Sequence, residues 1–322
     1  MSKVFITAEI PSVTITLLRK KGISCDINRT GKPLTKHELK EVFANYEAVI
    51  SSLSDQIEED VIHYASPGFK VISNYAVGID NIDVLAAKRK GVIVTNTPGV
   101  AGEAVAEHTF GLILACSKSI IEADKYVRQG KFDRWIADLF VSPQIWGKTI
   151  GIVGLGRIGT YVGHIAFGGF RMNILYHDIE KAEDFEMLTE AKFVTLEHLL
   201  KDSDIVTLHL PLTAQSRHLL GREEFKMMKN SAILINTARG SIIEEEALVW
   251  ALKEKEIAAA GLDVYEHEPE VSHELLDMPN VVLTPHTASA TEECRNTMAE
   301  IAAQNVIDVF EGKEPFGLIK VE

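Results

Sequence analysis

One segment in the middle of the chain constrains the fold more than any other. An apolar run over Thr149–Val153 is followed at once by Gly-Leu-Gly-Arg-Ile-Gly at positions 154–159, and then by an amphipathic segment to about Phe167. A second apolar run over residues 172–177 ends on Asp178. Strand, glycine-rich turn, helix, strand and acid in this order are typical of a βαβ unit that binds a dinucleotide.

Each glycine of this motif has a physical reason to be glycine. Gly154 permits the tight turn, Gly156 lets the backbone approach a pyrophosphate, and Gly159 lets the helix pack closely on the strand. The positive end of the helix dipole then faces the phosphates. The residues expected to contact the cofactor here are Gly154, Leu155, Gly156, Arg157, Ile158 and Gly159.

Asp178 predicts which dinucleotide is bound. A carboxylate at this position hydrogen-bonds the ribose hydroxyls of NAD and would repel the 2′-phosphate of NADP. Ile179 and Glu180 follow it and add no cation. The sequence therefore favours NAD, as NADH in the reducing direction. The alternative is a glycine turn without a ligand.

Composition limits the class of protein and its partners. The chain has 322 residues, of which 46% are hydrophobic and 25% charged, as expected for a soluble protein of about two domains. The net charge of −13 argues against nucleic acid and anionic membranes as partners. No apolar run has the length of a membrane span, and no signal peptide is expected. Three cysteines without metal-ligand spacing predict a reducing, cytoplasmic location and no metal site.

Short apolar runs alternate with helical segments, which predicts doubly wound parallel sheets. In the first third the expected strands are Lys3–Thr7, Ile23–Ile27, Ala48–Ser52, Lys70–Tyr75 and Gly91–Asn96, with helices at Lys36–Asn45 and Val84–Lys90. A second series has strands at Thr149–Val153, Asn173–His177, Phe193–Thr195, Ile205–Leu210, Ala232–Asn236, Ala259–Val264 and Val281–Thr284. Two series indicate two α/β units rather than one very large sheet.

The segments between and after these series suggest how the units are connected. A long helix is expected over Gly102–Gln129, followed by an irregular aromatic stretch over Lys131–Trp146. The chain crosses between the units near Pro98-Gly99. The last helix, about Glu292–Glu311, is too short to form a domain alone, so we expect it to return to the first unit.

Polar residues follow three apolar strands of the second series. Arg239 follows one strand, Asp263 and Glu268 follow the next, and His286 follows the last. Ligands of open α/β sheets bind outside the carboxyl ends of the strands, so these side chains can converge on the nicotinamide end of a dinucleotide. Taken singly, each could be a solvated cap, a loop residue or a turn residue.

With these motifs the chain resembles the D-2-hydroxyacid dehydrogenase family over essentially its whole length. The matching motifs are Asn74–Asp83, Val94–Pro98, Gly154–Gly159, Leu208–Thr213, Asn236–Gly240, Gly261–Pro269 and Thr284–His286. Within the family it is most similar to glyoxylate and hydroxypyruvate reductases. The resemblance implies two Rossmann-like doubly wound parallel-sheet domains, with an NAD-binding domain (99–287) inserted into a substrate domain (1–98 plus 288–322).

The resemblance also implies the catalytic residues. Arg239 would bind the substrate carboxylate with its guanidinium fork, and His286 would protonate the carbonyl oxygen. Glu268 would orient the His286 ring and favour its imidazolium form. The backbone at Val77 and Gly78 would hold the other side of the substrate carboxylate.

Further roles are implied for cofactor contacts and assembly. Asp263 would contact the nicotinamide carboxamide, and the cofactor cleft would be lined by Pro211, Thr237, Ala238 and Ala288. Members of the family are commonly dimers through the helix that here begins near Gly102. A homodimer is therefore expected, with the aromatic stretch Lys131–Trp146 near the partner's active site.

Two departures from the family pattern stand out. Thr287-Ala288 follows the histidine, where many members have Ile-Gly or Gly-Gly, which affects packing near the nicotinamide. Many glyoxylate reductases have a basic or neutral residue in place of Asp178, so the subgroup and the cofactor prediction point in different directions. The charge of Asp178 acts directly at the 2′ position, and we therefore retain NAD.

The substrate is expected to be a small 2-keto acid. The substrate loop Ser51–Ser54 offers Leu53 and no cation for a phosphate, and no regulatory domain is expected after Glu322. Glyoxylate, hydroxypyruvate, pyruvate and a sugar acid such as 2-ketogluconate remain open, since one pocket residue shifts preference by only about 1–3 kcal/mol. Glu268 argues against a formate dehydrogenase, which has glutamine there. The alternative function is an NAD-sensing co-repressor-like binding protein on the same scaffold.

Overall fold

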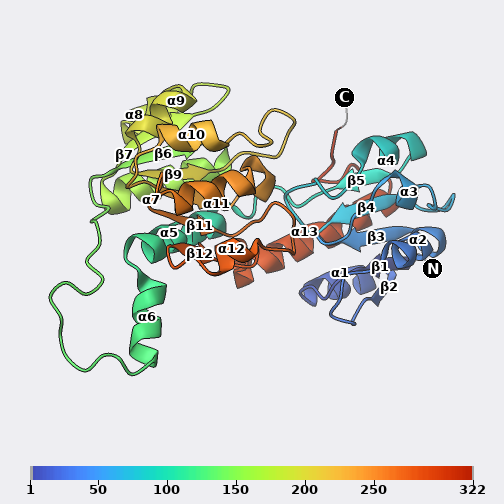
Figure 1. Ribbon diagram of the computed structural model, residues 1–322. Coiled ribbons are helices and arrows are strands. Elements are labelled where there is room, and N and C mark those ends of the chain that lie inside the picture. Colours follow the sequence, from blue (N-terminus) through green and yellow to red (C-terminus); the bar gives the residue numbers. More distant parts are fainter. Residues whose placement is uncertain (1–2, 321–322) are drawn as a thin grey trace. The chain divides into compact units, whose positions relative to one another are not determined.

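The computed structural model describes residues 3–320, which divide into two compact units (Figure 1). The first unit comprises the described residues up to Ala101 and from Ala290 onward, and the second comprises Gly102–Ser289. In the structure the boundaries between the units follow Ala101 and Ser289. The boundaries suggested by the sequence followed Pro98 and Thr287. The predicted fold class, two α/β domains with parallel sheets, is confirmed.

The first unit is built on a five-stranded parallel sheet of order β2-β1-β3-β4-β5. Its strands are β1 (Lys3–Ile6), β2 (Ser24–Ile27), β3 (Ala48–Ser51), β4 (Val71–Asn74) and β5 (Ile93–Thr95). Its helices are α1 (Val13–Lys20), α2 (Lys36–Asn45), α3 (Glu59–Ile62), α4 (Val84–Lys90) and α13 (Glu292–Phe310). Every residue of β3 and β4 is buried, as expected for parallel strands with helices on both faces.

The last helix, α13, packs against α1, β3 and β4 of the first unit. Small buried residues on α13, such as Ala299 and Ala302, allow this close approach. The hydroxyls of Thr14 and Ser73 donate hydrogen bonds to the carbonyls of these two alanines, at 3.1 and 3.0 Å. These contacts join residues more than 200 positions apart.

The second unit contains a seven-stranded parallel sheet of order β12-β11-β10-β9-β6-β7-β8. Its strands are β6 (Thr149–Val153), β7 (Asn173–His177), β8 (Lys192–Phe193), β9 (Ile205–Leu208), β10 (Ile233–Asn236), β11 (Ala259–Leu262) and β12 (Val281–Leu283). Strands β7 and β8 follow β6 on one side of the sheet, and β9 to β12 then extend the sheet on the other side of β6. The switch point between β6 and β9 is where open α/β sheets bind ligands.

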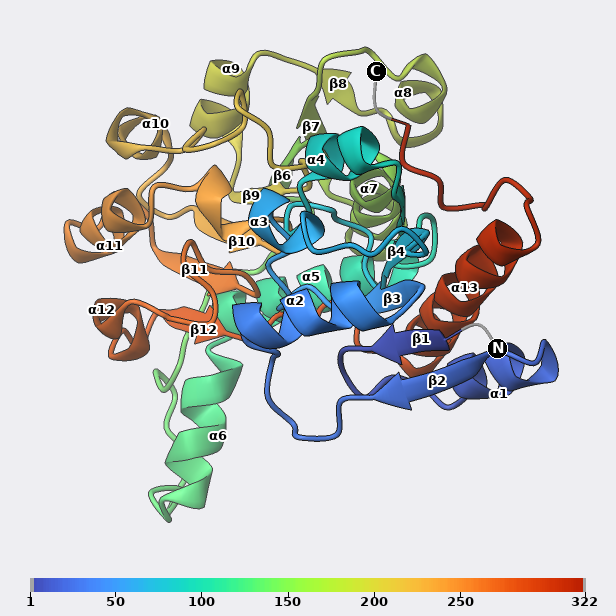
Figure 2. The same ribbon diagram turned by 90° about the vertical axis from the view of Figure 1, so that its right-hand side faces the viewer.

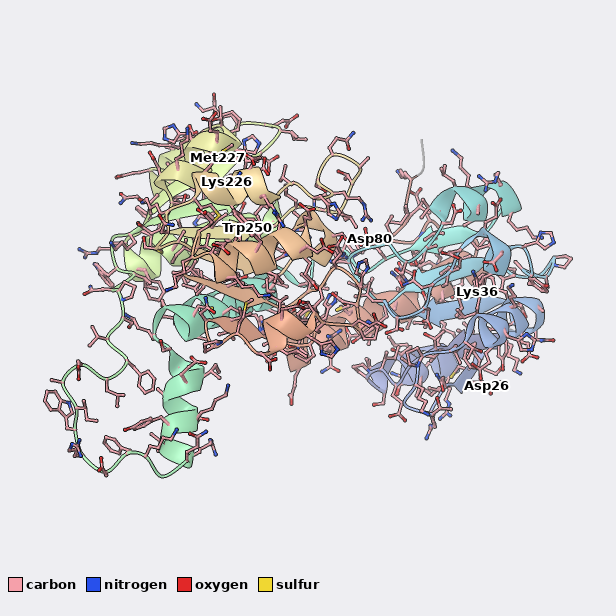
Figure 3. All side chains as sticks on the ribbon, in the orientation of Figure 1. Asp26, Lys36, Asp80, Lys226, Met227 and Trp250 are labelled. Carbon is pink, nitrogen blue, oxygen red and sulfur yellow. The ribbon has the colours of Figure 1, made fainter. Side chains whose placement is uncertain are left out.

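Helices cover this sheet over two separate hydrophobic cores. The helices are α5 (Gly102–Ser117), α6 (Ile120–Arg128), α7 (Arg157–Phe170), α8 (Glu183–Thr189), α9 (Leu196–Asp202), α10 (Arg222–Met227), α11 (Glu245–Lys253) and α12 (His273–Leu276), with a short 3₁₀ helix, η1 (Gly240–Ile242). One core includes residues of α5 and α7, and the other includes residues of α9, α10 and α11. Lys226 of α10 lies 6.0 Å from the ring centre of Trp250 on α11, so a cation–π contact joins these helices (Figure 3).

Strand boundaries agree with the sequence prediction to within two residues, but the prediction of one long helix over Gly102–Gln129 was wrong. Helix α5 ends at Ser117 and α6 begins at Ile120, with the axes bent by 64°. Ser119 between them has a left-handed backbone with φ 49°. The physical reason is packing: α5 is largely buried, whereas no described residue of α6 is.

Helix α6 and the following irregular segment extend away from the second unit's sheet in both views (Figures 1 and 2). Residues 131–146 form neither helix nor strand, as predicted. Among residues 3–320, no single helix is long and apolar enough to cross a membrane. Within the same residues, only α5 and α6 taken together reach that length and composition, and the bend separates them.

Candidate functional site

The glycine loop after β6 has the geometry expected of a pyrophosphate cradle. Gly154 has φ 93°, and a Cβ there would lie 2.7 Å from the carbonyl oxygen of His209. A Cβ on Gly159 would overlap the carbonyl oxygen of Gly154. Side chains are therefore excluded at both positions, as the motif predicted.

The start of α7 is open to an anion. Gly156 is the N-cap of this helix, and a Cβ there would meet nothing within 4 Å. The first turn of the described helix contains no acidic residue. Since the first N–H groups of a helix lack partners within it, they can bind phosphate oxygens here, and the residues fit a dinucleotide.

Asp178 directly follows β7 and lies against the glycine loop. Its Oδ2 accepts a hydrogen bond from the Leu155 N–H at 2.6 Å, and its Oδ1 accepts one from the Ile179 N–H at 2.6 Å. The half-buried carboxylate is thus held beside the turn that would carry the pyrophosphate. The carboxylate therefore lies beside the glycine loop, as the sequence predicted.

Three neighbouring strands bring the predicted catalytic residues to the same edge of the sheet. Strands β10, β11 and β12 are adjacent and parallel, and Arg239, Glu268 and His286 lie in the loops that follow them. His286 Nδ1 lies 2.8 Å from Glu268 Oε2. The other oxygen of Glu268, Oε1, accepts a hydrogen bond from the Tyr265 N–H at 3.1 Å. The carboxylate is therefore oriented by the backbone on one side and orients the imidazole on the other.

The backbone of His286 is also held in an uncommon conformation. Its φ is 54°, and its N–H donates to the carbonyl of Asp263 at 2.9 Å. Left-handed conformations of residues other than glycine are uncommon and often mark functional sites. Tyr265 supports the same loop, because its hydroxyl donates to the Thr284 carbonyl at 2.9 Å.

The buried side chain of Asp263 stabilises the loop after β12 through hydrogen bonds. Its fully buried carboxylate accepts hydrogen bonds from Thr284 Oγ1 at 2.6 Å and from the N–H groups of Thr287 and Ala288, each at 2.8 Å. Burial alone would raise the pKa of Asp263, but these bonds, together with His108, hold it below its ordinary value. The expected contact of Asp263 with the nicotinamide carboxamide stays a prediction.

The Arg239 loop is closed by an asparagine. Asn236 Nδ2 donates to the Arg239 carbonyl at 2.8 Å, and its Oδ1 accepts from the Ala238 N–H at 3.0 Å. Arg239 Nη1 donates to the Ala238 carbonyl at 2.7 Å. Gly240 follows, and a Cβ there would overlap the backbone of Tyr265. The loops after β10 and β11 are therefore in direct backbone contact.

The remaining predicted cofactor residues belong to the same unit. Thr237 is buried and its hydroxyl lies 3.1 Å from that of Thr109, while Ala288 is buried beside Asp263. Ala238 is half-buried in the Arg239 loop. Pro211 is exposed after β9, and its carbonyl accepts from Ser216 Oγ at 2.7 Å. Their cofactor contacts stay predictions.

The predicted substrate residues Leu53, Val77 and Gly78 lie in the first unit. Leu53 is half-buried in the loop after β3. The loop after β4 is shaped by two asparagines: Asn96 donates to the Val77 carbonyl at 2.7 Å, and Asn74 donates to the Gly78 carbonyl at 2.9 Å. Their contacts with substrate stay predictions.

The sequence prediction missed residues that hold the loops of the predicted catalytic residues. Tyr265 lies in the loop after β11 and could have been noticed for its place between Asp263 and Glu268. His108 could not, because it lies on α5 and meets Thr284, 176 residues later, at 3.0 Å. Within residues 3–320, no three His, Cys, Asp or Glu side chains gather as a metal site would require.

Comparisons with known proteins show the family to which the chain belongs. The model of the NAD-binding domain of D-isomer-specific 2-hydroxyacid dehydrogenases matches residues 110–288. The glyoxylate reductase of Thermofilum pendens is 44% identical, over 99% of this chain and 95% of that protein. Among solved structures, the TT0316 protein of Thermus thermophilus has a TM-score of 0.92 and 39% identity, over 99% of this chain and 100% of that one.

A second solved structure bears on the cofactor. The NADPH-dependent glyoxylate/hydroxypyruvate reductase SmGhrB of Sinorhizobium meliloti, in complex with NADP and malonate, has a TM-score of 0.87 and 29% identity, over 99% of this chain and 96% of that one. The family model covers more than half of the chain, and the glycine loop at residues 154–159 lies within it. The chain belongs to the D-isomer-specific 2-hydroxyacid dehydrogenase family and is an NAD-binding oxidoreductase.

Proposed function

We propose that this enzyme reduces a small 2-keto acid, such as glyoxylate, hydroxypyruvate or pyruvate, to the 2-hydroxy acid, with the D configuration where the product is chiral and with His286 as the general acid. The observation that supports this most strongly is the 2.8 Å contact between His286 Nδ1 and Glu268 Oε2, in a loop adjacent to that of Arg239. A carboxylate accepts from Nδ1, which leaves Nε2 to exchange a proton with a ligand.

The residues divide the reaction between them. Arg239 binds the substrate carboxylate, because its planar guanidinium can donate two parallel hydrogen bonds. When bound, NADH supplies the hydride that reduces the carbonyl carbon. His286 gives its Nε2 proton to the carbonyl oxygen as that oxygen becomes a hydroxyl, and Glu268 stabilises the imidazolium before transfer. In the oxidation direction His286 accepts the same proton.

We also propose that NADH is preferred over NADPH. The Asp178 carboxylate is anchored to the Leu155 N–H at 2.6 Å, so its charge cannot easily turn away from a 2′-phosphate. The related SmGhrB is NADPH-dependent, so the ratio of the rates with NADH and NADPH tests this proposal directly. A sugar acid such as 2-ketogluconate is the alternative substrate, and Leu53, Val77 and Gly78 are the proposed substrate contacts of the first unit.

We propose a homodimer formed through α6 and the segment that follows it. Large apolar side chains are exposed there, and exposed apolar patches mark interaction surfaces. The exposed fractions are 49% for Ile120, 58% for Val127, 60% for Phe132, 80% for Trp135, 77% for Val141 and 50% for Trp146. A cytoplasmic location stays a prediction from the cysteine content.

The test is oxidation of NADH and NADPH, followed by absorbance, against glyoxylate, hydroxypyruvate, pyruvate and 2-ketogluconate, with chiral analysis of every product except glycolate, the achiral product of glyoxylate. Turnover with NADH is expected on at least one of them, with a D-product wherever the product is chiral. Turnover that prefers NADPH would contradict the role of Asp178. No turnover on any, with NADH still binding, would favour the co-repressor-like alternative.

A further inference from the structure

A second carboxylate, that of Glu266, lies two residues before Glu268 and joins three segments of the second unit. Its Oε2 accepts a hydrogen bond from the Glu245 N–H at 3.1 Å, and its own N–H donates to Glu245 Oε2 at 3.1 Å. Its Oε1 lies 2.5 Å from His218 Nε2. None of these three residues has a role in the chemistry described above.

The Glu266 carboxylate acts as a cap for α11. That helix begins at Glu245, and its N-cap, Glu244, makes no capping hydrogen bond with its side chain in the described chain. Glu266 supplies the missing acceptor from another loop, next to the positive end of the helix. Burial alone would raise the pKa of Glu266, but the bonds from Glu245 and His218 hold it below its ordinary value.

The partners of Glu266 lead directly to the Arg239 loop. Helix α11 follows that loop after only a few residues, and Gly240 packs against the Tyr265–Glu266 backbone. The His218 N–H donates to the Ser241 carbonyl at 2.8 Å, so His218 contacts the loop with its backbone and Glu266 with its ring. The Glu266 side chain is only 12% exposed, and a carboxylate so placed stays where its partners hold it.

The loop that contains Glu266 also contacts the residues around the proposed general acid, through Tyr265. Tyr265, the residue before Glu266, donates its N–H to Glu268 and its hydroxyl to the Thr284 carbonyl. A shift of the Tyr265–Glu266 backbone would therefore move Glu268 and, through it, His286.

We infer that Glu266 is a positioning residue: paired with His218 and Glu245, it braces the Arg239 loop against the Glu268 loop. This keeps the guanidinium and the Glu268–His286 pair at a constant spacing. The inference rests on the proposed function for its catalytic consequence, but the brace itself can be measured separately.

The test compares Glu266→Gln, His218→Gln and the double variant with the wild type. Glutamine keeps the size and one acceptor oxygen while removing the charge. The matched controls are His198→Gln and Asp202→Asn, which break an exposed histidine–aspartate pair of 3.2 Å on α9 in the same unit. The measurements are kcat and KM for glyoxylate with NADH, the Kd for NADH, and hydrogen exchange of the backbone over residues 239–245 and 263–268.

For Glu266→Gln we expect KM to rise and kcat to fall, so that kcat/KM drops about 10- to 100-fold, because small displacements of catalytic groups have effects of this size. The Kd for NADH should change less than about twofold, and exchange should quicken in both loops. His218→Gln should change the same quantities in the same direction by less. The double variant should have a kcat/KM no lower than about that of the less active single variant. Both substitutions remove the same contact between His218 and Glu266, so their effects should not add.

A lower melting temperature with unchanged kcat, KM and loop exchange would mean that Glu266 only stabilises the fold, and would overturn the inference. Should Glu266→Gln not fold, His218→Gln decides by the same measurements. A wild type inactive on glyoxylate, hydroxypyruvate, pyruvate and 2-ketogluconate would refute the proposed keto acid reduction alone. The brace would then stand if exchange quickens in both loops of the variant, and fall if it does not.

Discussion

At the scale of single residues, the proposed catalytic groups are held in a few positions by their hydrogen bonds. Glu268 has a backbone donor on one oxygen and His286 on the other, and the His286 backbone is held by Asp263. Each group is therefore oriented before a ligand arrives. Preorganisation of this kind accounts for much of the effect of acid–base residues.

The first prediction concerns His286→Gln. Glutamine keeps polarity and approximate size but cannot carry a transferable proton at neutral pH, so kcat should fall at least about 100-fold. The Kd for NADH should stay near that of the wild type, since the glycine loop is untouched. Initial rates and NADH fluorescence titration measure the two quantities. A variant with undiminished kcat would remove His286 from the role of general acid.

The second prediction concerns Asp178→Asn. The change removes the negative charge near the adenosine ribose while keeping the side chain's shape, so the ratio of kcat/KM for NADH over NADPH should fall about tenfold, equivalent to about 1.4 kcal/mol. Glu180→Gln, an equal change of charge two residues later, is the control. If both variants shift the ratio equally, a general charge effect rather than Asp178 would explain it.

At the scale of elements, parallel strands place the site and loop contacts hold it. The glycine loop and the strands could be predicted because their signals are local: an apolar run, a turn that needs glycine, and a following helix. The break after Ser117 could not, since it depends on where packing of α5 ends rather than on a helix-breaking residue. The contacts of His108 with the β12 loop could not either, because nothing in the sequence links residues so far apart.

The third prediction concerns Gly240→Ala. A Cβ at Gly240 would overlap the backbone of Tyr265, and backbone cannot rotate away as a side chain can. The loops after β10 and β11 should separate, with kcat/KM falling at least about 100-fold and stability by about 1–3 kcal/mol. Gly111→Ala, at an exposed α5 position with open space, should instead be neutral or stabilise by up to about 1 kcal/mol. Denaturant unfolding and initial rates distinguish these results, and equal behaviour of the two variants would disprove the close-contact argument.

The fourth prediction concerns Asp263→Asn and pH. Because the folded state lowers the pKa of Asp263 below its ordinary 3.8, its ionised form stabilises the fold above about that pH, and this contribution is lost as pH falls through the lowered value. The variant should be about 2 kcal/mol less stable near neutral pH, and the difference should shrink in acid. Urea unfolding between neutral and acidic pH tests this, with Asp202→Asn as an exposed control. A difference that stays constant with pH would contradict it.

At the scale of the whole molecule, α6 and the segment that follows it expose several large apolar side chains of the described chain to solvent. None of the nine described residues of α6 is buried, while Trp135 and Phe132 beyond it are 80% and 60% exposed. We call α6 and the segment up to Trp146 the arm. Contact between water and the large aromatic side chains of the arm is unfavourable, and association of two copies would bury these side chains.

The last prediction concerns Phe132→Glu combined with Trp135→Glu. Two charges on the arm would have to be buried in the proposed dimer, so the pair of changes should convert dimer to monomer in sedimentation experiments at micromolar concentration. Met187→Glu, a similar change at a 77% exposed position of α8, should leave the assembly unchanged. A dimer that persists with the doubly substituted arm would move the interface elsewhere, whereas a wild type that sediments as a monomer would refute the homodimer itself. Because both substitutions lie outside the loops of Arg239, Glu268 and His286, NADH binding by the resulting monomer should persist, which separates assembly from the fold of the cofactor domain.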